Sequence, residues 1–446
     1  MPTGFAQVPS AGRYRIANAV VPAVLVETTA PLPAAGEGLV LMDIEVDGPG
    51  IAAIRAPGAG DPDRPCLDMN RGMVWPCFVD MHTHIDKGHI WPRRSNPDGT
   101  FMGALESVRT DREANWSAID VTRRMDFSLR CAFAHGTALL RTHLDSIAPQ
   151  HRISWPVFAE MRERWAGRID LQAVSLFTLE EAADTAFLSE IADVVQHNRG
   201  VLGCVTYMDP ELDRILDALM RAAADRGLDL DFHTDETQDP EARSLEHIAE
   251  AALRNGFRGR IVCGHCCSLS RQADDTARRI VDKVARAGLS IVSLPLCNMY
   301  LQDRHYGRTP RSRGITMLHE LRASGVEVAV ASDNTRDPFY AYGDLDMMEV
   351  FRESVRIGQL DHPIDAAPDL VAAAPARILG RPDRGVLRAG SPADLVLFRG
   401  RSWTELLARP QSDRTVLRNG RPIDTTAPDY RELDDLFPPP DGWRPE

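Results

Sequence analysis

The sequence contains no apolar stretch long enough to cross a bilayer. Its longest apolar runs, such as GLVLMDIEV at positions 38–46, are far shorter than the roughly 20 residues that a membrane helix needs. The N-terminal segment MPTGFAQVPSAGRYR lacks the long apolar core that secretory signals carry. We therefore expect a cytoplasmic protein with no membrane partner.

Acidic residues outnumber basic ones, and the sequence lacks a basic cluster interleaved with aromatic residues. The net charge is −13, and only two of the 446 residues are lysines. The main electrostatic contribution to nucleic-acid binding is therefore missing, and we expect no nucleic-acid partner. Cysteine is also sparse, with eight residues scattered along the chain, which favours reduced thiols over a disulfide framework.

Apolar runs alternate with long amphipathic stretches from about residue 74 onward. Continuous apolar strands that alternate with helices are typical of a parallel α/β sheet. Eight such units predict a (β/α)8 barrel. The candidate strands are 74–84, 137–145, 170–177, 201–207, 228–236, 260–268, 289–296 and 326–334.

Both ends of the chain have a different character from the middle. Short β-rich patches joined by glycine and proline precede residue 74, and short strands with turn signals return after about residue 385. We expect a small β-sandwich assembled from residues 1–73 and 385–446, beside a barrel formed by residues 74–384. The last segment, DDLFPPPDGWRPE, is expected to be an irregular tail.

Polar residues that can bind metals or move protons follow five of the eight candidate strands. Active sites of barrels lie at this carboxyl-terminal edge of the strands. A lone His-x-His pair is a weak signal, but five strand ends with such residues are a much stronger one. These residues are His82, His84, His143, Asp145, His233, Asp235, Glu236, His265 and Asp333.

The residue types indicate metal-dependent hydrolysis. Imidazole nitrogens together with a carboxylate suit Zn²⁺ or Fe²⁺, and a catalytic metal makes hydroxide available near neutral pH. A carboxylate that does not bind the metal can then move protons to the substrate. Glu236, three residues after His233, is placed to do this.

The ordered set of motifs resembles the amidohydrolase superfamily, in particular its cytosine-deaminase-like branch. The resemblance rests on FVDMHTHID, HTDE, GH, SDN, NMYLQDR and, near the C-terminus, GSPADLVLF. It implies that His82, His84, His233 and Asp333 bind one metal ion, and that Asp333 also takes a proton from the attacking water. It further implies that Glu236 protonates a ring nitrogen, and that His265 hydrogen-bonds the developing oxygen while ammonia or an amine leaves.

One metal ion is expected and not two. Dinuclear members of the superfamily bridge their metals with a modified lysine on the fourth strand. The candidate fourth strand, VLGCVTY, contains no lysine, because Lys87 follows the first strand and Lys283 lies in a helical stretch. A lysine-bridged pair is therefore excluded, which leaves one Zn²⁺ or Fe²⁺ ion.

The substrate-binding positions depart from the cytosine deaminases. Thr178 stands where those enzymes have a glutamine, Asn334 replaces an aspartate and Phe339 replaces a tryptophan. Gln302, in NMYLQDR, completes the expected substrate-binding set. ASDNTRD is instead similar to N-isopropylammelide amidohydrolase, another member of the branch. Because polar mismatches discriminate strongly between substrates, cytosine, a pterin, a triazine and other aminated N-heterocycles all stay open.

Other residues have simpler interpretations. His143 and Asp145 are expected to orient the metal ligands or the substrate. His89 is either a substrate contact or a solvated loop residue. CGHC, at 263–266, resembles a redox motif, but that motif begins a helix, whereas here it lies in an apolar strand. Buried, inert thiols are the default.

The leading hypothesis is a mononuclear metal-dependent deaminase of a cytosine-like heterocycle. A ring-opening cyclic amidohydrolase, which releases no ammonia, is the enzymatic alternative. A silent barrel that only binds a heterocycle is the non-enzymatic one, although Glu236 and Asp333 argue against it. Because related enzymes usually form homo-oligomers, we expect a homo-oligomer.

Overall fold

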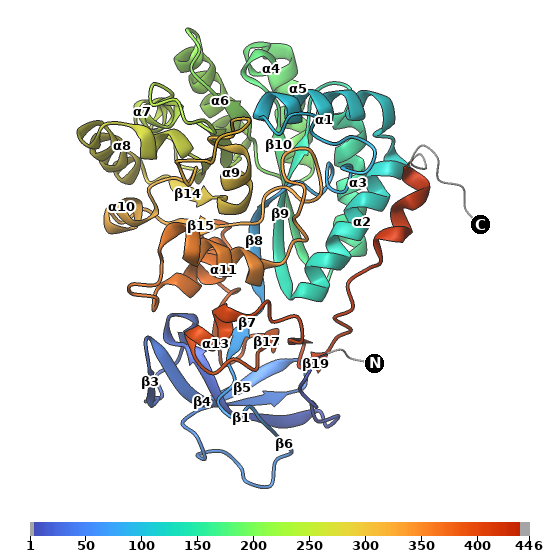
Figure 1. Ribbon diagram of the computed structural model, residues 1–446, viewed down its shortest axis with the longest axis vertical. Coiled ribbons are helices and arrows are strands. Elements are labelled where there is room, and N and C mark those ends of the chain that lie inside the picture. Colours follow the sequence, from blue (N-terminus) through green and yellow to red (C-terminus); the bar gives the residue numbers. More distant parts are fainter. Residues whose placement is uncertain (1–3, 438–446) are drawn as a thin grey trace. The chain divides into compact units, whose positions relative to one another are not determined.

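Strands alternate with helices through the middle of the chain, as the alternation of apolar runs and amphipathic stretches predicts. The computed structural model describes residues 4–437 (Figure 1). By its internal contacts the chain forms two compact units. Unit 1 comprises residues 4–80, 130–139 and 346–427, and unit 2 comprises residues 81–129, 140–345 and 428–437.

The strands of unit 2 follow one another in chain order. One sheet has the order β10-β9-β8, and the other has the order β11-β12-β13-β14-β15, with all its neighbours parallel. Isolated parallel bridges add Val174 to Val201, Leu202 to Leu230 and Thr83 to Asp333. The strands are β8 (Phe78–Thr83), β9 (Thr137–Asp145), β10 (Asp170–Leu176), β11 (Val205–Thr206), β12 (Leu230–Thr234), β13 (Ile261–His265), β14 (Ser290–Ser293) and β15 (Val328–Val330).

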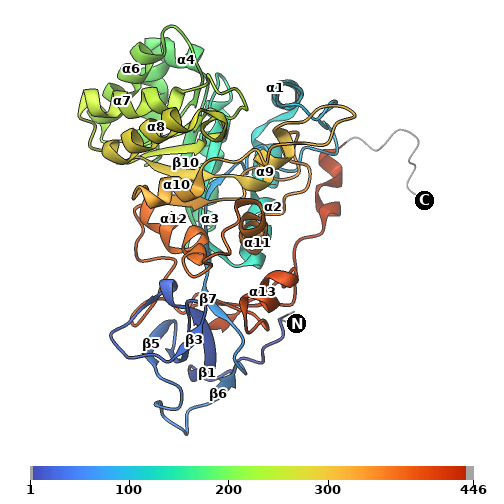
Figure 2. The same ribbon diagram turned by 60° about the vertical axis from the view of Figure 1, so that its left-hand side comes forward.

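Helices follow most of these strands. Helix α8 shows why they form, because its buried residues Ala277, Ile280, Val281 and Val284 have the i, i+3, i+4, i+7 spacing of one helix face. Figures 1 and 2 show α6, α7 and α8 side by side. The helices are α1 (Phe101–Asn115), α2 (Ala118–His135), α3 (His151–Arg164), α4 (Leu179–Ala183), α5 (Thr185–His197), α6 (Leu212–Arg226), α7 (Ser244–Asn255), α8 (Asp274–Ala287), α9 (Pro295–Leu301) and α10 (Leu318–Ala323), with the 3-10 helix η2 (Cys267–Arg271).

Unit 1 contains most of the remaining strands. Its sheets have the orders β3-β4-β1-β6, with β5 on β4, then β16-β2 and β19-β18-β17-β7. The strands are β1 (Arg13–Pro22), β2 (Val26–Glu27), β3 (Ala34–Gly36), β4 (Leu39–Asp47), β5 (Gly50–Arg55), β6 (Cys66–Asp68), β7 (Val74–Pro76), β16 (Leu387–Arg388), β17 (Leu395–Leu397), β18 (Thr415–Arg418) and β19 (Arg421–Pro422). The helices are η1 (Ala23–Leu25), α11 (Met347–Gly358), η3 (Ala367–Val371), α12 (Ala373–Ile378) and α13 (Trp403–Ala408).

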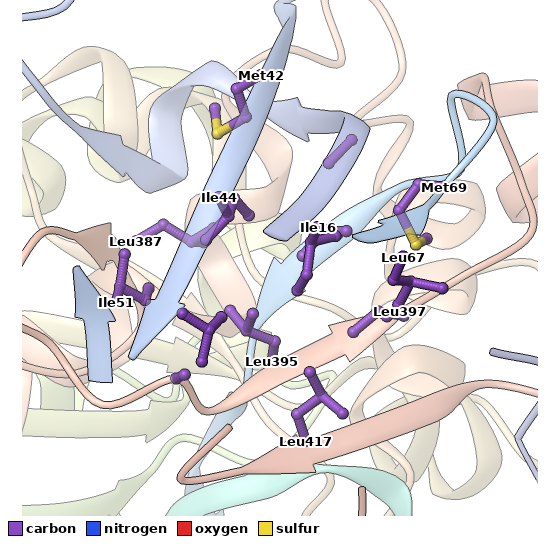
Figure 3. Close-up of a cluster of buried hydrophobic side chains, with 14 of the residues drawn as sticks. Ile16, Met42, Ile44, Ile51, Leu67, Met69, Leu387, Leu395, Leu397 and Leu417 are labelled. Carbon is purple, nitrogen blue, oxygen red and sulfur yellow. The ribbon is translucent and has the colours of Figure 1, made fainter. Parts of the chain in front are cut away.

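Residues from both ends of the chain build the apolar core of unit 1. Ile16 on β1 pairs with Ile44 on β4, and both are fully buried. Leu395 and Leu417, from the C-terminal part of the chain, belong to the same buried cluster (Figure 3). Strand β17 also pairs with β7, so segments more than 300 positions apart share one sheet.

The C-terminal segment is partly helical, which corrects the expectation of an irregular tail. Residues Tyr430–Leu436 form the 3-10 helix η4, which Asp429 caps. The rest of the expected tail, residues 438–446, lies outside the described residues. Across residues 4–437, the helices are too short or too polar to span a membrane.

Candidate active site

The residues expected to bind a metal converge from three separate strands of unit 2. His82 lies on β8 and His84 follows its end, while His233 lies on β12. Asp333 lies just past β15, and its backbone N–H donates to the carbonyl of His82 at 2.9 Å. All four side chains are buried.

Their ligand atoms surround one point. Nε2 of His233 lies 3.2 Å from Nε2 of His82 and 3.2 Å from Nε2 of His84. Oδ1 of Asp333 lies 3.2 Å from Nε2 of His84 and 3.7 Å from Nε2 of His82. Ligands about 2.1 Å from a tetrahedral ion are separated by roughly 3.4 Å. Four of the six separations among these atoms therefore match the ligands of one cation.

The histidines of this group are in the form that binds metals. Burial lowers the pKa values of His82, His84 and His233 well below the ordinary 6.5, and the neighbouring histidines and Lys87 lower them further. The rings are therefore neutral at pH 7, and a neutral ring leaves one nitrogen lone pair for a cation.

Glu236 and His265 lie on one side of this group and share a partner, Asn298 on α9. The amide nitrogen of Asn298 lies 3.0 Å from Nδ1 of His265 and 3.2 Å from Oε1 of Glu236. Because an amide N–H only donates, Nδ1 of His265 accepts and its proton lies on Nε2. That Nε2 is buried and has no hydrogen-bond partner among residues 4–437, so it is available to a ligand.

Glu236 is held in an environment that favours its protonated form. Burial raises the pKa of Glu236 well above the ordinary 4.5, and the nearby charge of Asp333 raises it further. A ligand oxygen of Glu236 lies within 4.8 Å of one of Asp333. Two neighbouring carboxyl groups whose environments push their pKa values apart are a pattern that serves acid and base catalysis.

The backbone at this edge of the strands is strained. His265 and Asp333 have φ values of 67° and 65°, in the left-handed region that non-glycine residues rarely adopt. Each such residue costs of order 1–2 kcal/mol, and strain of this kind gathers at functional sites. Gly264, before His265, leaves room for the His82 ring, because a Cβ there would lie 2.9 Å from Cε1 of His82.

His143 and Asp145, which were expected to orient ligands, are both buried on β9. The His143 ring lies 3.9 Å from the His82 ring, measured between centroids, so it packs directly on a proposed ligand. Asp145 binds Lys87 at 3.1 Å and Arg112 at 2.9 Å. Burial lowers the pKa of Lys87, but the Asp145 and Asp86 carboxylates outweigh that effect and raise it. Lys87 is therefore a buried cation.

The expected substrate-binding residues lie in different places. Asn334 and Phe339 are buried in the loop after β15, where Asn334 donates to Asp337 at 2.8 Å. Gln302 ends α9 and donates to the carbonyl of Glu236 at 3.2 Å. The Thr178 hydroxyl caps α4 and contacts Glu181 at 2.6 Å. The Thr-x-x-Glu spacing of a capping box would have indicated this role from the sequence.

Burial decides between the interpretations of His89 and of the cysteines in CGHC. His89 is 1% exposed and packs edge-on against Phe127, so the option of a solvated loop histidine is wrong. Cys263 and Cys266 are buried, and all eight cysteines are free thiols. Burial raises the pKa values of both thiols well above the ordinary 9.0, which agrees with inert cysteines.

Two residues of the site had no assigned role in the sequence analysis. Asn298 follows β14 by five positions and lies within a helix, so no strand-end pattern marks it. Lys87 was considered only as a metal-bridging residue. In the structure it lies 5.4 Å from the Phe339 ring centroid, which connects the loop after β8 with the loop after β15.

The chain is similar to known proteins along most of its length. The chain is 60% identical to pterin deaminase from Rhizobium rhizogenes (strain K84 / ATCC BAA-868) over 438 residues, which cover 98% of this chain and 100% of the relative. It is 22% identical to N-isopropylammelide isopropyl amidohydrolase from Pseudomonas sp. (strain ADP), over 80% of this chain and 87% of the relative.

Solved structures share the fold. The structure of 5-methylcytosine deaminase from Klebsiella pneumoniae, liganded with 5-fluorocytosine, matches this chain with a TM-score of 0.78 and 23% sequence identity. The match covers 92% of this chain and 97% of the deaminase chain. The family model described as "Amidohydrolase family" matches residues 121–424. Because the family model matches more than half of the chain, and because a 60% identical relative covers nearly all of it, the chain belongs to the amidohydrolase family.

Proposed function

We propose that this protein is a mononuclear metal-dependent deaminase of an aminated N-heterocycle, and that its substrate is a pterin. The observation that carries the proposal is the convergence of three Nε2 atoms and one carboxylate oxygen, four of whose six separations are 3.2–3.7 Å, beside the Glu236 carboxyl, whose pKa is raised by burial. The match to a pterin deaminase over the whole chain supports the same reaction class.

The donor set fits a single Zn²⁺ or Fe²⁺ ion held by His82, His84, His233 and Asp333. Neutral imidazoles with one carboxylate are typical ligands of these ions. The buried Lys87 is bound to Asp145, which leaves it unsuited to bridging a second ion. A bound cation would lower the pKa of a water molecule at the site.

The side chains around that position divide the proton chemistry among them. Asp333 accepts the proton of the attacking water. Glu236 donates its proton to the ring nitrogen beside the amine-bearing carbon, which makes that carbon more electrophilic. His265 donates a hydrogen bond from Nε2 to the oxygen that gains charge, because Asn298 holds the Nδ1 side. Asp333 then passes the proton that it took from the water to the amine, the C–N bond breaks and ammonia leaves. The proton of the new hydroxyl returns to Glu236 as the carbonyl forms.

A pterin is favoured among the heterocycles that the sequence left open. Thr178, Asn334 and Phe339 depart from the cytosine deaminases at the ring-reading positions, and the 60% identical relative acts, by its name, on a pterin. The similarity to 5-methylcytosine deaminase, at 23% identity, concerns the fold alone. We assign Asn334, Phe339, Gln302 and Thr178 to substrate recognition, and His143 and Asp145 to the support of the ligands.

The test measures metal content and ammonia release on the same preparation. We expect about one Zn or Fe per chain, and ammonia from pterin at a higher kcat/KM than from cytosine or an aminotriazine. Chelation abolishes turnover, and the metal restores it. Glu241→Gln, a change at an exposed glutamate paired with Arg243, serves as the neutral control. Loss of substrate without ammonia would indicate ring opening, and two metals per chain would contradict the mononuclear site.

The fold around the site is proposed to be a closed (β/α)8 barrel with a β-sandwich. Two observations support a closed barrel: neighbouring strands in both sheets follow one another in chain order, and a parallel bridge joins Thr83 at the end of β8 to Asp333 just past β15. We propose domains at 1–73, 74–384 and 385–446, with boundaries set by where the predicted barrel strands begin and end. The division into two compact units differs from this, because it places α11 and α12 in unit 1 with the terminal strands. A cytoplasmic homo-oligomer is proposed on the sequence arguments given above.

A further inference from the structure

The C-terminal segment 428–437 is a folded element of unit 2. It contains η4, drawn in red beside α2 in Figure 1. The Asp429 side chain accepts from the backbone N–H of Arg431 at 3.0 Å, and Glu432 accepts from the N–H of Asp429 at 3.2 Å. This reciprocal cap fixes the direction in which the first helical residue, Tyr430, enters the structure.

Tyr430 contacts the two loops that follow the metal-binding strand ends. We call residues 85–94 the β8 loop and residues 334–345 the β15 loop. The Tyr430 hydroxyl donates to Oδ1 of Asp344 at 2.7 Å, and the guanidinium carbon of Arg336 lies 3.7 Å from the Tyr430 ring centroid. On the other side, the His89 ring centroid lies 6.2 Å from that of Tyr430.

The two loops are also bonded to each other at this place. The backbone N–H of His89 donates to the carbonyl of Thr335, and that of Trp91 donates to the carbonyl of Arg336, both at 2.9 Å. Arg336 has a φ of 46°, so the β15 loop is strained where Tyr430 covers it. Such a conformation persists only when surrounding contacts hold it.

The other end of the segment is anchored independently of Tyr430. Arg93 donates to the carbonyl of Leu436 at 3.4 Å and lies 5.9 Å from the Phe437 ring centroid. Asp111 and Asp120 hold Arg93 at 2.8 and 2.6 Å. The segment is therefore fixed at one end to the β8 loop, and Tyr430 at its other end bears on the β15 loop.

We propose that Tyr430 is a positioning residue of the active site, which acts through Arg336 and Asp344 to hold the β15 loop in its substrate-binding conformation. The inference rests on the proposed function, because Asn334 and Phe339 of that loop are the side chains assigned to the substrate. Asp333 is fixed separately, through its backbone bond to His82. Loss of Tyr430 therefore weakens substrate binding and leaves the metal in place.

The experiment compares Tyr430→Ala and Tyr430→Phe with the wild-type holoenzyme. Tyr430→Ala raises KM about ten-fold, the combined size expected for one hydrogen bond and one stacked guanidinium. Tyr430→Phe keeps the stacking and loses the bond to Asp344, so its KM rises less. The metal content and kcat stay close to wild type. The matched control is Arg431→Ala, in the same helix, whose exposed side chain pairs with Asp429; it changes neither constant.

A second measurement does not depend on activity. Amide hydrogen exchange of the metal-loaded proteins should be faster in both loops in Tyr430→Ala and unchanged in Arg431→Ala. If the wild type deaminates no heterocycle but the loops exchange faster in the variant, the proposed function fails and the positioning role stands. Unchanged KM with unchanged exchange overturns the inference. Loss of metal, or a fall in kcat that parallels a general loss of stability, overturns it as well.

Discussion

The amide nitrogen of Asn298 lies 3.2 Å from Oε1 of Glu236 and 3.0 Å from Nδ1 of His265. One side chain thus sets the position of the proposed acid and the tautomer of the proposed hydrogen-bond donor. Both effects originate in α9, a short helix that contributes none of the four proposed metal ligands.

Replacement of Asn298 by alanine should slow the reaction without loss of metal. We expect turnover to fall about ten- to a hundred-fold, a size typical of residues that orient reactive groups. Metal analysis and ammonia release measured together provide the check. Asn255→Ala, at a surface residue bound to Asp217, is the control. Full activity in Asn298→Ala would show that Glu236 and His265 need no common partner.

Glu236→Gln should separate proton transfer from metal binding. The amide keeps the size of the side chain but has no proton to transfer, so turnover should fall by at least about 10²- to 10⁴-fold with the metal retained. Asp333→Asn should lower metal content and turnover together, because that carboxylate is both ligand and base. A metal-free Glu236→Gln would make Glu236 a ligand, and a fully active one would refute the mechanism.

Gly264→Ala should disturb the metal site through His82. The added methyl would lie 2.9 Å from Cε1 of the imidazole, closer than carbon atoms tolerate, so the ring must move. We expect weaker metal binding, measured by competition with a chelator. Gly12→Ala adds a methyl where no atom lies within 4 Å and should bind the metal as the wild type does. Equal affinities in both variants would contradict the proposed packing.

Asp337 should make stability depend on pH. Burial raises its pKa to about 6 from the ordinary 3.8, so the folded state keeps a proton that the unfolded state releases. The contribution of protonated Asp337 to the free energy of unfolding is fully present below about pH 4. It is lost as the pH rises through 6, and the total loss is about 3 kcal/mol. Asp337→Asn does not titrate. Its urea midpoint, relative to wild type, should rise between pH 4 and 7; a constant difference would contradict the shift.

Cys266→Ser should fold and keep most of its activity. The thiols of Cys263 and Cys266 are buried, and burial raises their pKa values, so no thiolate is available for exchange. Turnover of the wild type and the variant, each with and without a disulfide oxidant or reductant, is the measurement. Activity that depends on either reagent would reinstate a redox role for CGHC.

The proposed ligands were predictable because they follow apolar strands. His82, His233 and Asp333 all lie at strand ends, a pattern that is visible in the sequence alone. The fourth strand was predicted as one continuous strand over 201–207. In the structure it consists of isolated bridges at Val201 and Leu202 followed by β11, and between them the Ser175 hydroxyl bonds to the N–H and carbonyl of Gly203. A Cβ at Gly203 would lie 2.1 Å from the carbonyl of Asp231, a closeness that no pattern of hydrophobicity encodes.

Contacts between residues that are far apart in the sequence were not predictable. The role of Asn298 depends on the direction in which α9 leaves β14. The role of Tyr430 depends on where the chain returns after the terminal strands. Neither residue has a local signal, because a helical asparagine and a tyrosine near a chain end are common in any protein. Thr178 was the opposite case, in which a local signal, the capping box, was present.

The backbone bond from Asp333 to His82 joins positions about 250 residues apart in the chain. A ribosome therefore synthesises the proposed fourth ligand about 250 residues after the first. Contacts of such long range form slowly, since a large loop has to close first. In the proposed site, an ion that binds all four ligands would stabilise only chains in which this long-range contact has formed, so metal binding and the closing of this loop are linked.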